Sequence, residues 1–228
     1  MSLSVIIPSR SSDKFIRCVT AIRRHEPRLP IFAMDDGLDP GRISGSPCFC
    51  CDNAPIDVVP CPEVFNFARN MNLGIQDAGD DDVLLLNDDA LLLTPGGFTA
   101  MERAARDHPE YGVISAAAEG AQACQQPHGA GLRPVDRMVA FFAALIPRRA
   151  IEAVGFLDER YAGYGHEDDD MCLRLRRAGF KIGVFDDCLV EHGEAEKSTF
   201  RSRSDIRERF MQNRYEFRLK WGMDPEVA

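Results

Sequence analysis

The amino-acid sequence predicts an α/β protein, a single domain in which a mainly parallel sheet is flanked by helices on both faces. Short apolar runs alternate with segments of helical periodicity along most of the chain, and strands separated by helices usually pair in parallel. The length of 228 residues fits one domain. With 45% hydrophobic and 28% charged residues, the composition is that of a globular protein with a sizeable core.

The expected strands are short and mostly apolar, which is typical of strands buried on both faces. They cover residues 3–8, 31–34, 56–59, 83–86, 112–115, 138–146 and 181–185. The expected helices carry apolar residues at helical spacing. They cover residues 13–24, 67–78, 97–108, 148–154 and 167–178, and a basic helical segment spans about 197–228. Residues 39–55, rich in Gly, Pro and Cys, and residues 116–134 are expected to be irregular.

The charge of the chain is strongly acidic and unevenly placed. The net charge is −9 and the pI is about 5.1, which argues against a general nucleic-acid binder or a polybasic membrane surface. Residues 197–228 carry +3, whereas residues 1–196 carry −12. Adjacent carboxylates repel each other, so they need solvent, a helix N-terminus, a cationic partner or a metal. They cluster at residues 35–36, 80–82, 88–89, 167–170 and 186–187.

The sequence also predicts a cytoplasmic protein with reduced thiols. Its first residues lack the features of a signal peptide, and the longest apolar run, residues 139–147, is shorter than the ~20 residues that span a bilayer. Cysteines in such a protein are usually free. Two interpretations of one cysteine-rich stretch stay open, a loop with buried thiols and a zinc clip. The zinc clip would use Cys48, Cys50, Cys51 and Cys61.

Polar residues follow three of the expected strands, at residues 8–10, 35–37 and 87–89. In an open parallel sheet, ligands bind beyond the carboxyl ends of the strands. The sequence has neither the glycine-rich dinucleotide fingerprint nor a phosphate loop. An acidic edge of this kind favours phosphates held through a hard divalent cation such as Mg²⁺ or Mn²⁺. The alternative is a set of solvated turns, in which Asn and Asp are common.

Four acidic residues begin the expected helix at residue 167. Asp168 falls on the apolar stripe that includes Leu175, so it is a candidate general base, although a helix cap is the simpler alternative. Asp170 falls on the opposite side, four residues before Arg174, and is expected to be a surface ion-pair member.

His192 follows a strand-like run, residues 188–191, and precedes a polar loop. A lone histidine is more often structural than a ligand, so metal binding by His192 depends on further evidence. The loop is expected to close over an anionic ligand, or else to be a solvated charged segment. Its polar residues are Lys197, Ser198, Thr199, Arg201 and Arg203.

Taken in order, these motifs resemble glycosyltransferase family 2, the inverting nucleotide-sugar enzymes of the GT-A fold. The resemblance covers nearly the whole chain. It rests on an opening strand, an Asp-Asp-Gly turn, an Asn-rich helix, a variant of Asp-x-Asp, a Glu-Asp-x-Asp motif, a Val-x-His motif and a Lys-Trp-Gly ending. In this sequence they lie at residues 4–8, 34–37, 65–75, 87–89, 155–179, 190–192 and 220–222.

The resemblance implies a division of labour along the chain. The donor-binding part would span about residues 1–95, the acceptor-side part about 96–196, and a basic helical segment about 197–228. Donor contacts would come from Pro8, Ser9, Arg10, Asp35, Asp36, Asn66, Arg69 and Asp88. Metal ligands would be Asp89, His192 and Asn87, and the catalytic residues Asp168, as base, and Glu167. Asn87 departs from the family pattern, because an amide removes one charge from the first position of Asp-x-Asp.

The expected function is therefore inverting, metal-dependent transfer of a hexosyl or similar group. The donor would be a nucleoside diphosphate sugar, and the acceptor a hydroxyl of a glycan or lipid-linked saccharide. Residues 120–134, Tyr161 and Tyr164 are candidates to shape the acceptor cleft, although the tyrosines could equally pack the loop. A noncatalytic acidic module that binds Ca²⁺ or nucleotide is the alternative. Nucleotidyl transfer is disfavoured, because residues 9–12 do not form a glycine-rich triphosphate loop.

Overall fold

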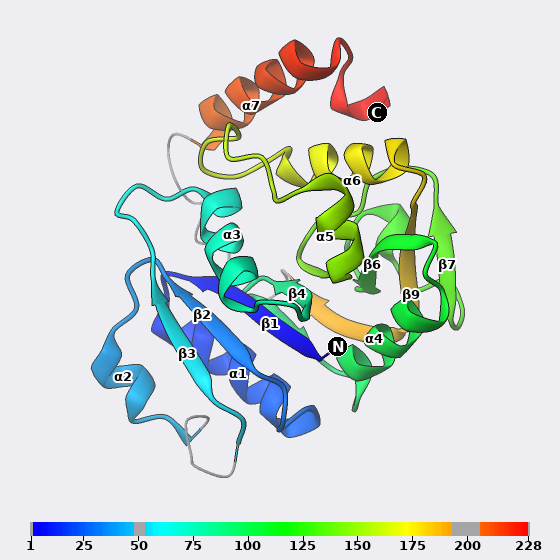
Figure 1. Ribbon diagram of the computed structural model, residues 1–228. Coiled ribbons are helices and arrows are strands. Elements are labelled where there is room, and N and C mark those ends of the chain that lie inside the picture. The colour runs from blue at the N-terminus through cyan, green and yellow to red at the C-terminus, as the bar shows by residue number, and fades with distance from the viewer. Residues whose placement is uncertain (1, 48–52, 193–205, 228) are drawn as a thin grey trace.

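A computed structural model of the chain describes residues 2–47, 53–192 and 206–227 (Figure 1). The strands of this part are β1 (Leu3–Ser9), β2 (Ile31–Asp35), β3 (Ile56–Pro60), β4 (Asp82–Leu86), β5 (Ala90–Leu92), β6 (Tyr111–Ala117), β7 (Leu132–Val135), β8 (Ala143–Ile146) and β9 (Lys181–His192). They form one sheet in the order β3-β2-β1-β4-β8-β6-β9-β5, and β7 pairs with β9.

The sheet is mixed. Its first half, β3-β2-β1-β4, is parallel. Strand β8 then runs antiparallel to both β4 and β6. Strand β9 is parallel to β6 and antiparallel to β5 and β7. The parallel arrangement predicted from alternating strands and helices thus holds for the N-terminal half and for β6 with β9, whereas β5, β7 and β8 pair antiparallel with their neighbours.

Helices cover both faces of the sheet, as predicted. Those described are α1 (Ser12–His25), α2 (Pro40–Ser44), α3 (Phe67–Asp77), α4 (Gly97–Asp107), α5 (Arg148–Val154), α6 (Glu167–Arg177) and α7 (Ile206–Trp221), with 3₁₀ turns η2 (Ala123–Gln125) and η3 (Pro225–Val227). Side chains of α1, α2 and α4 pack on one face, and those of α3, α5 and α6 on the other. Helix α7 lies outside α6 (Figure 1).

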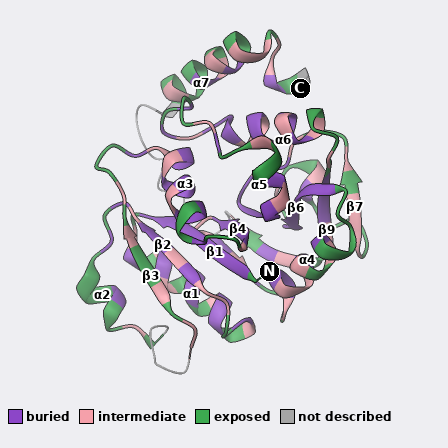
Figure 2. Ribbon diagram, in the orientation of Figure 1, coloured by how far each residue is buried: buried purple, intermediate pink, exposed green. Residues whose placement is uncertain are grey.

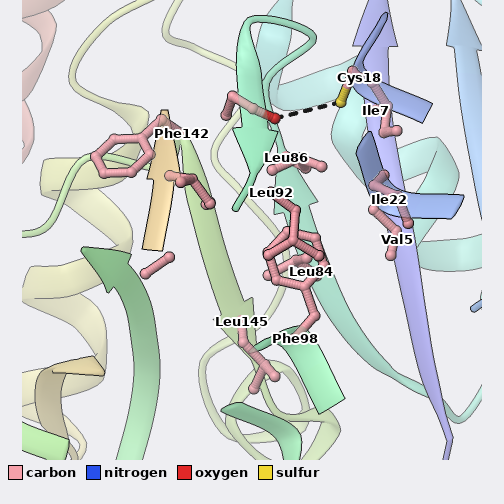
Figure 3. Packing of buried hydrophobic residues seen from close by; sticks show 14 of the residues in the cluster. Val5, Ile7, Cys18, Ile22, Leu84, Leu86, Leu92, Phe98, Phe142 and Leu145 are labelled. Atoms are coloured by element: carbon pink, nitrogen blue, oxygen red, sulfur yellow. Dashed lines mark hydrogen bonds between the residues drawn. The ribbon is translucent and has the colours of Figure 1, made fainter. Parts of the chain in front are cut away.

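The two cores follow from strand periodicity, because successive side chains of a strand point to opposite faces. Val5 and Ile7 pack with α1 on one side, whereas Ile6 packs with α3 on the other. Figure 3 shows Val5, Ile7, Ile22 and Leu84 in the first of these cores. The strands β1, β4 and β8 are buried along their whole length, and Figure 2 shows β1 in the purple of buried residues.

Most predicted elements are present, with boundaries shifted by a few residues. The predicted strand at 138–146 is shorter, Ala143–Ile146, and β9 joins the predicted strand at 181–185 to the run at 188–191. Two strands and one helix were not predicted. Strand β5 has only three residues, β7 contains a proline that is tolerated at a sheet edge, and α2 has five residues within the predicted loop.

The predicted zinc clip cannot be placed, since Cys48, Cys50 and Cys51 lie outside the described residues. Cys61 is a free thiol, as are the other described cysteines, Cys18, Cys124, Cys172 and Cys188. Burial, together with Asp36 and Asp35, raises the pKa of Cys61 to about 12. None of the helices in the described part of the chain has both the length and the apolar composition that crossing a bilayer requires.

Candidate active site

Polar side chains gather at the carboxyl ends of β1, β2 and β4, where the sequence predicted them. Strand pairing places Ser9 beside Asp35, and Ser9 Oγ donates to Asp88 Oδ2 at 2.6 Å. Arg10 Nε lies 3.7 Å from Asp36 Oδ2, and the Arg10 side chain is 48% exposed. This donor edge, as we call residues 8–10, 35–36 and 87–89, therefore combines one buried and several half-buried carboxylates with an exposed guanidinium.

Asp35 closes the turn that follows β2. Its Oδ1 accepts hydrogen bonds from the N–H groups of Gly37, at 2.8 Å, and Leu38, at 2.6 Å. Gly37 has a φ of 121°, a conformation that other residues rarely adopt. Pro8 is buried inside β1, opposite Met34. A contact of Asp35 or Pro8 with a nucleobase stays a prediction.

The pKa of Asp88, at the donor edge, is shifted from its ordinary value. Its pKa is raised to about 6, mainly by burial and also by the neighbouring Asp89, while the hydrogen bond from Ser9 opposes this shift. A carboxylate held in this way gains from a nearby cation, because a positive charge favours the ionised form. The turn that contains Asp88 is also held by Cys18 of α1, whose Sγ lies 3.5 Å from the Ala90 carbonyl oxygen (Figure 3).

His192, the last residue of β9, faces Asp89. Strand pairing places His192 beside Ala90, and its Nε2 lies 3.5 Å from Asp89 Oδ1, with both side chains about four-fifths buried. Its imidazole stacks on Phe142, with 4.5 Å between ring centroids. A carboxylate oxygen suits Mn²⁺ or Mg²⁺, and a neutral imidazole nitrogen can add one further metal ligand. Asn87 lies in the same turn, where its N–H donates to the Phe142 carbonyl oxygen.

The described residues do not by themselves complete a metal site. Within residues 2–47, 53–192 and 206–227, no group of three or more His, Cys, Asp or Glu side chains gathers closely enough to hold an ion. A hard cation in such a partial site takes its other ligands from water and from phosphate oxygens. The donor set therefore fits an ion that binds together with a diphosphate.

Asn66 and Arg69 have structural contacts at the start of α3. Asn66 caps the helix, because its Oδ1 accepts from the Arg69 N–H at 3.0 Å. Its Nδ2 donates to the Glu159 carbonyl oxygen at 2.9 Å, and the Arg69 guanidinium donates to the Val64 carbonyl oxygen. Their predicted role as donor contacts stays a prediction. Asn72, which the sequence analysis missed, binds the backbone of Leu157 through both amide atoms.

The acidic N-terminus of α6 follows a tight turn. Gly165 and His166 both have positive φ, 113° and 71°. Glu167 is buried, and its Oε2 accepts from the Gly165 N–H at 2.6 Å. Asp168 Oδ1 accepts from the Asp169 N–H at 2.9 Å. The Glu167 carboxylate thus closes the turn, and Asp168 is the next side chain along the helix.

Asp168 lines a cavity of about 700 Å³ between α6, α7 and the irregular region before β8. Tyr164 lines it as predicted, and Gln122, Ala123 and Cys124 bring in the predicted acceptor-cleft loop. Tyr161 does not have the predicted exposure for stacking on a ligand, because it is fully buried. The remaining lining residues are Val135, Asp136, Arg137, Met138, Ala140, Gly165, His166, Asp169, Phe210, Pro225 and Glu226.

The pKa values of the two predicted catalytic residues are raised. Burial raises the pKa of Asp168 well above its usual value, and the charges of Asp169 and Glu167 raise it further. Burial raises the pKa of Glu167 to about 7, against the hydrogen bonds that its carboxylate accepts. Raised carboxyl pKa values next to a cavity are typical of general acids and bases.

The donor edge and the cavity meet at residues 138–142. Met138 and Ala140 line the cavity, and Phe142 contacts Asn87 and His192 at the donor edge. Because consecutive Cα atoms are about 3.8 Å apart, the Cα atoms of Ala140 and Phe142 are separated by less than about 8 Å. One short segment, residues 138–142, therefore joins the wall of the cavity to the donor edge.

Asp170 is buried, which corrects the prediction of a surface position. The predicted ion pair exists, with Arg174 Nε 2.8 Å from Asp170 Oδ2. The other carboxylate oxygen accepts from Lys220 Nζ at 2.6 Å, Trp221 Nε1 at 2.8 Å and the Tyr161 hydroxyl at 3.1 Å. The periodicity of α6 could not reveal this burial, because the covering residues come from α7.

Helix α7 also holds the turn before α6. Asn213 is fully buried, and its Nδ2 donates to the carbonyl oxygens of Ala162 and Gly165, both at 3.0 Å. From the other side, the Phe67 N–H donates to the Gly163 carbonyl oxygen at 2.7 Å. The turn that presents Asp168 is therefore fixed by α3 and α7 together.

Two other acidic residues are buried. Asp186 forms an ion pair with Arg133, whose Nε lies 2.9 Å from Asp186 Oδ2. Asp82 is also buried, and its Oδ1 accepts from the Arg148 N–H at the start of α5. The predicted loop closure over an anion concerns Lys197, Ser198, Thr199, Arg201 and Arg203, which lie outside the described residues.

A family model described as the N-terminal domain of galactosyltransferase matches residues 143–197. This stretch starts with β8 and contains both α6 and His192. No curated protein matches the chain.

Solved glycosyltransferase structures are similar to the described fold over nearly the whole chain. GalNAc-T7 with UDP, GalNAc and Mn²⁺ has a TM-score of 0.73 and 11% identity, covering 99% of this chain and 49% of its own. The mannosyltransferase PcManGT from Pyrobaculum calidifontis with GDP-Man and Mn²⁺ has a TM-score of 0.72 and 17% identity, and the match covers 98% of this chain and 66% of that structure. S. aureus TarS has a TM-score of 0.68 and 14% identity, and the match covers 96% of this chain and 40% of that structure.

The chain spans between 40% and 66% of the length of these three structures. At 11–17% identity, the likeness concerns the fold. The chain has the GT-A glycosyltransferase fold, as the sequence resemblance implied.

Proposed function

We propose that the chain is a glycosyltransferase that moves a sugar, hexosyl or similar, from a nucleoside diphosphate sugar to a hydroxyl of a glycan or lipid-linked saccharide. The observation that carries the proposal is that one short segment, residues 138–142, joins two sites of different chemistry. One is the donor edge, where Asp89 faces His192. The other is the cavity that contains Asp168. The galactosyltransferase match, and the UDP, GDP-Man and Mn²⁺ bound in the similar structures, support this assignment.

The donor would lie along the donor edge. Arg10 is the exposed cation there, and guanidinium groups bind phosphate oxygens through paired N–H donors. Asp35 and Asp36 lie on β2 and the turn after it, next to Ser9, within reach of the nucleoside. The donor-binding residues in this proposal are Pro8, Ser9, Arg10, Asp35, Asp36, Asn66, Arg69 and Asp88.

Asp89 and His192, with Asn87 in the same turn, would hold a Mn²⁺ or Mg²⁺ ion. When bound, such an ion acts as a Lewis acid that stabilises negative charge on a leaving diphosphate. The Asp89 carboxylate and the His192 imidazole, which stacks on Phe142, would hold this ion. The Asp88 carboxylate, which accepts a hydrogen bond from Ser9, would add negative charge to this site.

Asp168 would act as the general base. It removes the proton from the acceptor hydroxyl while the hydroxyl oxygen forms a bond to the anomeric carbon and the bond to the diphosphate breaks. Attack from the face opposite the leaving group inverts the configuration. Burial raises the pKa of Asp168, which improves its match to a proton acceptor at neutral pH. Glu167 contributes by closing the turn that aims Asp168 at the cavity.

The division into a donor part, residues 1–95, an acceptor part, 96–196, and a basic helical segment, 197–228, belongs to the same proposal. The cavity supports it, because its wall combines the acceptor part with Phe210, Pro225 and Glu226 from the last segment. We also propose a cytoplasmic location. It is supported by the five cysteines of the described ranges, all of which are free thiols.

Nucleoside diphosphate sugars are expected to raise the melting temperature of the protein when Mn²⁺ is present. A ligand that binds only the folded state stabilises it by mass action, by about 2.7 kcal/mol at 100 times its Kd. The measurement is a thermal-shift panel of UDP- and GDP-sugars with Mn²⁺ or with EDTA. The shift should disappear in EDTA and in Asp89→Asn.

The matched control for this panel is Asp107→Asn, at an exposed residue that ends α4. This variant should keep the full Mn²⁺-dependent shift. A shift with Ca²⁺ alone, and none with any nucleotide, would favour the noncatalytic module instead.

A further inference from the structure

His166 occupies a backbone conformation that histidine rarely adopts. It is the only non-glycine residue with positive φ in the described part of the chain, at 71°. It is 5% exposed and stands immediately before α6 without capping the helix through its side chain. Glycine would adopt this conformation at lower cost. A non-glycine residue held there is often part of a ligand site.

The orientation of the imidazole is set by Asp169. His166 Nδ1 lies 2.8 Å from Asp169 Oδ2. In the neutral imidazole, a hydrogen bond from Nδ1 to this carboxylate places the proton on Nδ1 and leaves a lone pair on Nε2. Nε2 is buried and has no hydrogen-bond partner among the described residues. A buried acceptor without a partner is unfavourable unless a ligand provides the donor.

Both side chains line the cavity that contains Asp168. Phe210 covers the imidazole, with 4.3 Å between the ring centroids, and is itself 44% exposed. Gly165 leaves the space that this ring fills, because a Cβ there would lie 2.8 Å from Phe210.

The charge of the cavity selects against anions. Its lining includes the carboxylates of Asp136, Asp168, Asp169 and Glu226. The one guanidinium in the lining, Arg137, donates to the Glu226 carbonyl oxygen. A phosphate or uronate would be repelled by this wall, whereas hydroxyl groups can donate to it.

We propose that His166 Nε2 accepts a hydrogen bond from a hydroxyl group of an uncharged saccharide acceptor, next to the hydroxyl that reacts at Asp168. The inference deepens the proposed function and rests on it. His166 is then an acceptor-binding residue, and Asp169 is a positioning residue that keeps Nε2 unprotonated.

The tautomer of His166 is measured by long-range ¹H–¹⁵N correlation on protein labelled in its five histidines. His166→Asn assigns the signal, since asparagine tolerates positive φ. The free protein should show protonated Nδ1 and bare Nε2. Uncharged methyl glycosides, added with UDP and Mn²⁺, should shift the Nε2 resonance, and methyl glucuronide should not.

Any of three results overturns the inference. The first is a protonated Nε2 in the free protein, and the second is a glycoside that binds without changing the Nε2 resonance. The third is a glycoside panel in which no uncharged glycoside binds, whether or not the glucuronide does. The tautomer of the free protein does not depend on the donor. If no nucleotide sugar raises the melting temperature but the free protein has the stated tautomer, the proposed function is therefore wrong.

Asp169→Asn supplies the kinetic test. An amide can donate to Nδ1 as well as accept from it, so the variant no longer holds the proton on Nδ1, and the tautomer with the proton on Nε2 cannot accept. The KM for the acceptor glycoside should rise about 10-fold or more, while the donor KM stays within about 3-fold. A merely structural role would instead lower the melting temperature and leave the acceptor KM unchanged, which contradicts the assignment.

Discussion

Replacing Asp168 with asparagine is expected to lower the rate of sugar transfer by about 10²- to 10⁴-fold, because the variant loses the general base. Donor binding should persist, since Asp168 lines the cavity and not the donor edge. The measurement is steady-state kinetics with a donor selected by the thermal-shift panel. A variant that binds donor normally and keeps the full rate would remove Asp168 from the mechanism.

The control for this variant is the pH dependence of protein stability and of the transfer rate. Burial raises the pKa of Asp168 in the folded protein, with smaller contributions from Asp169 and Glu167. Stability from this group is therefore complete below the unfolded pKa and is lost as pH rises through the folded pKa. Asp168→Asn should be at least as stable as the wild type at pH 8. In the wild type, the rate should rise as pH increases through the raised pKa.

Replacing Asp170 with alanine is expected to destabilise the fold by about 3–5 kcal/mol, the range for breaking a buried ion pair from one side. The change leaves Lys220 and Arg174 without the carboxylate that both contact, and removes the acceptor of Trp221 and Tyr161. Chemical denaturation measures the loss.

The matched control is Asp13→Ala, which breaks an exposed pair with Arg42. Surface pairs of this kind contribute up to about 1 kcal/mol. Equal losses in Asp170→Ala and Asp13→Ala would show that α7 is not fastened to α6 through Asp170.

The parallel half of the sheet could be predicted because each strand and helix carries its own periodicity. Val5, Ile6 and Ile7 face two different cores, and an uninterrupted apolar run is the pattern that such a strand requires. The donor edge followed from the same logic, since Ser9, Asp35 and Asp88 end neighbouring strands. Helical phase also placed Asp168 on the inner side of α6.

What could not be predicted depends on contacts between distant segments. The burial of Asp170 requires α7, about 50 residues later in the chain. Asn213 is an ordinary polar residue in its own helix, and only the docked structure shows it holding the turn at Gly165. The left-handed conformation of His166 has no sequence signal either, because positive φ is expected at glycine.

The central claim is that the donor edge and the cavity form one active site for sugar transfer. Its most direct test is the release of nucleoside diphosphate from a donor of the panel, with Mn²⁺ and without acceptor, by the wild type, Asp89→Asn and Asp168→Asn. The account predicts slow, EDTA-sensitive hydrolysis by the wild type and a large loss in both variants. A donor that binds and is not hydrolysed, or that all three proteins hydrolyse equally, would contradict it.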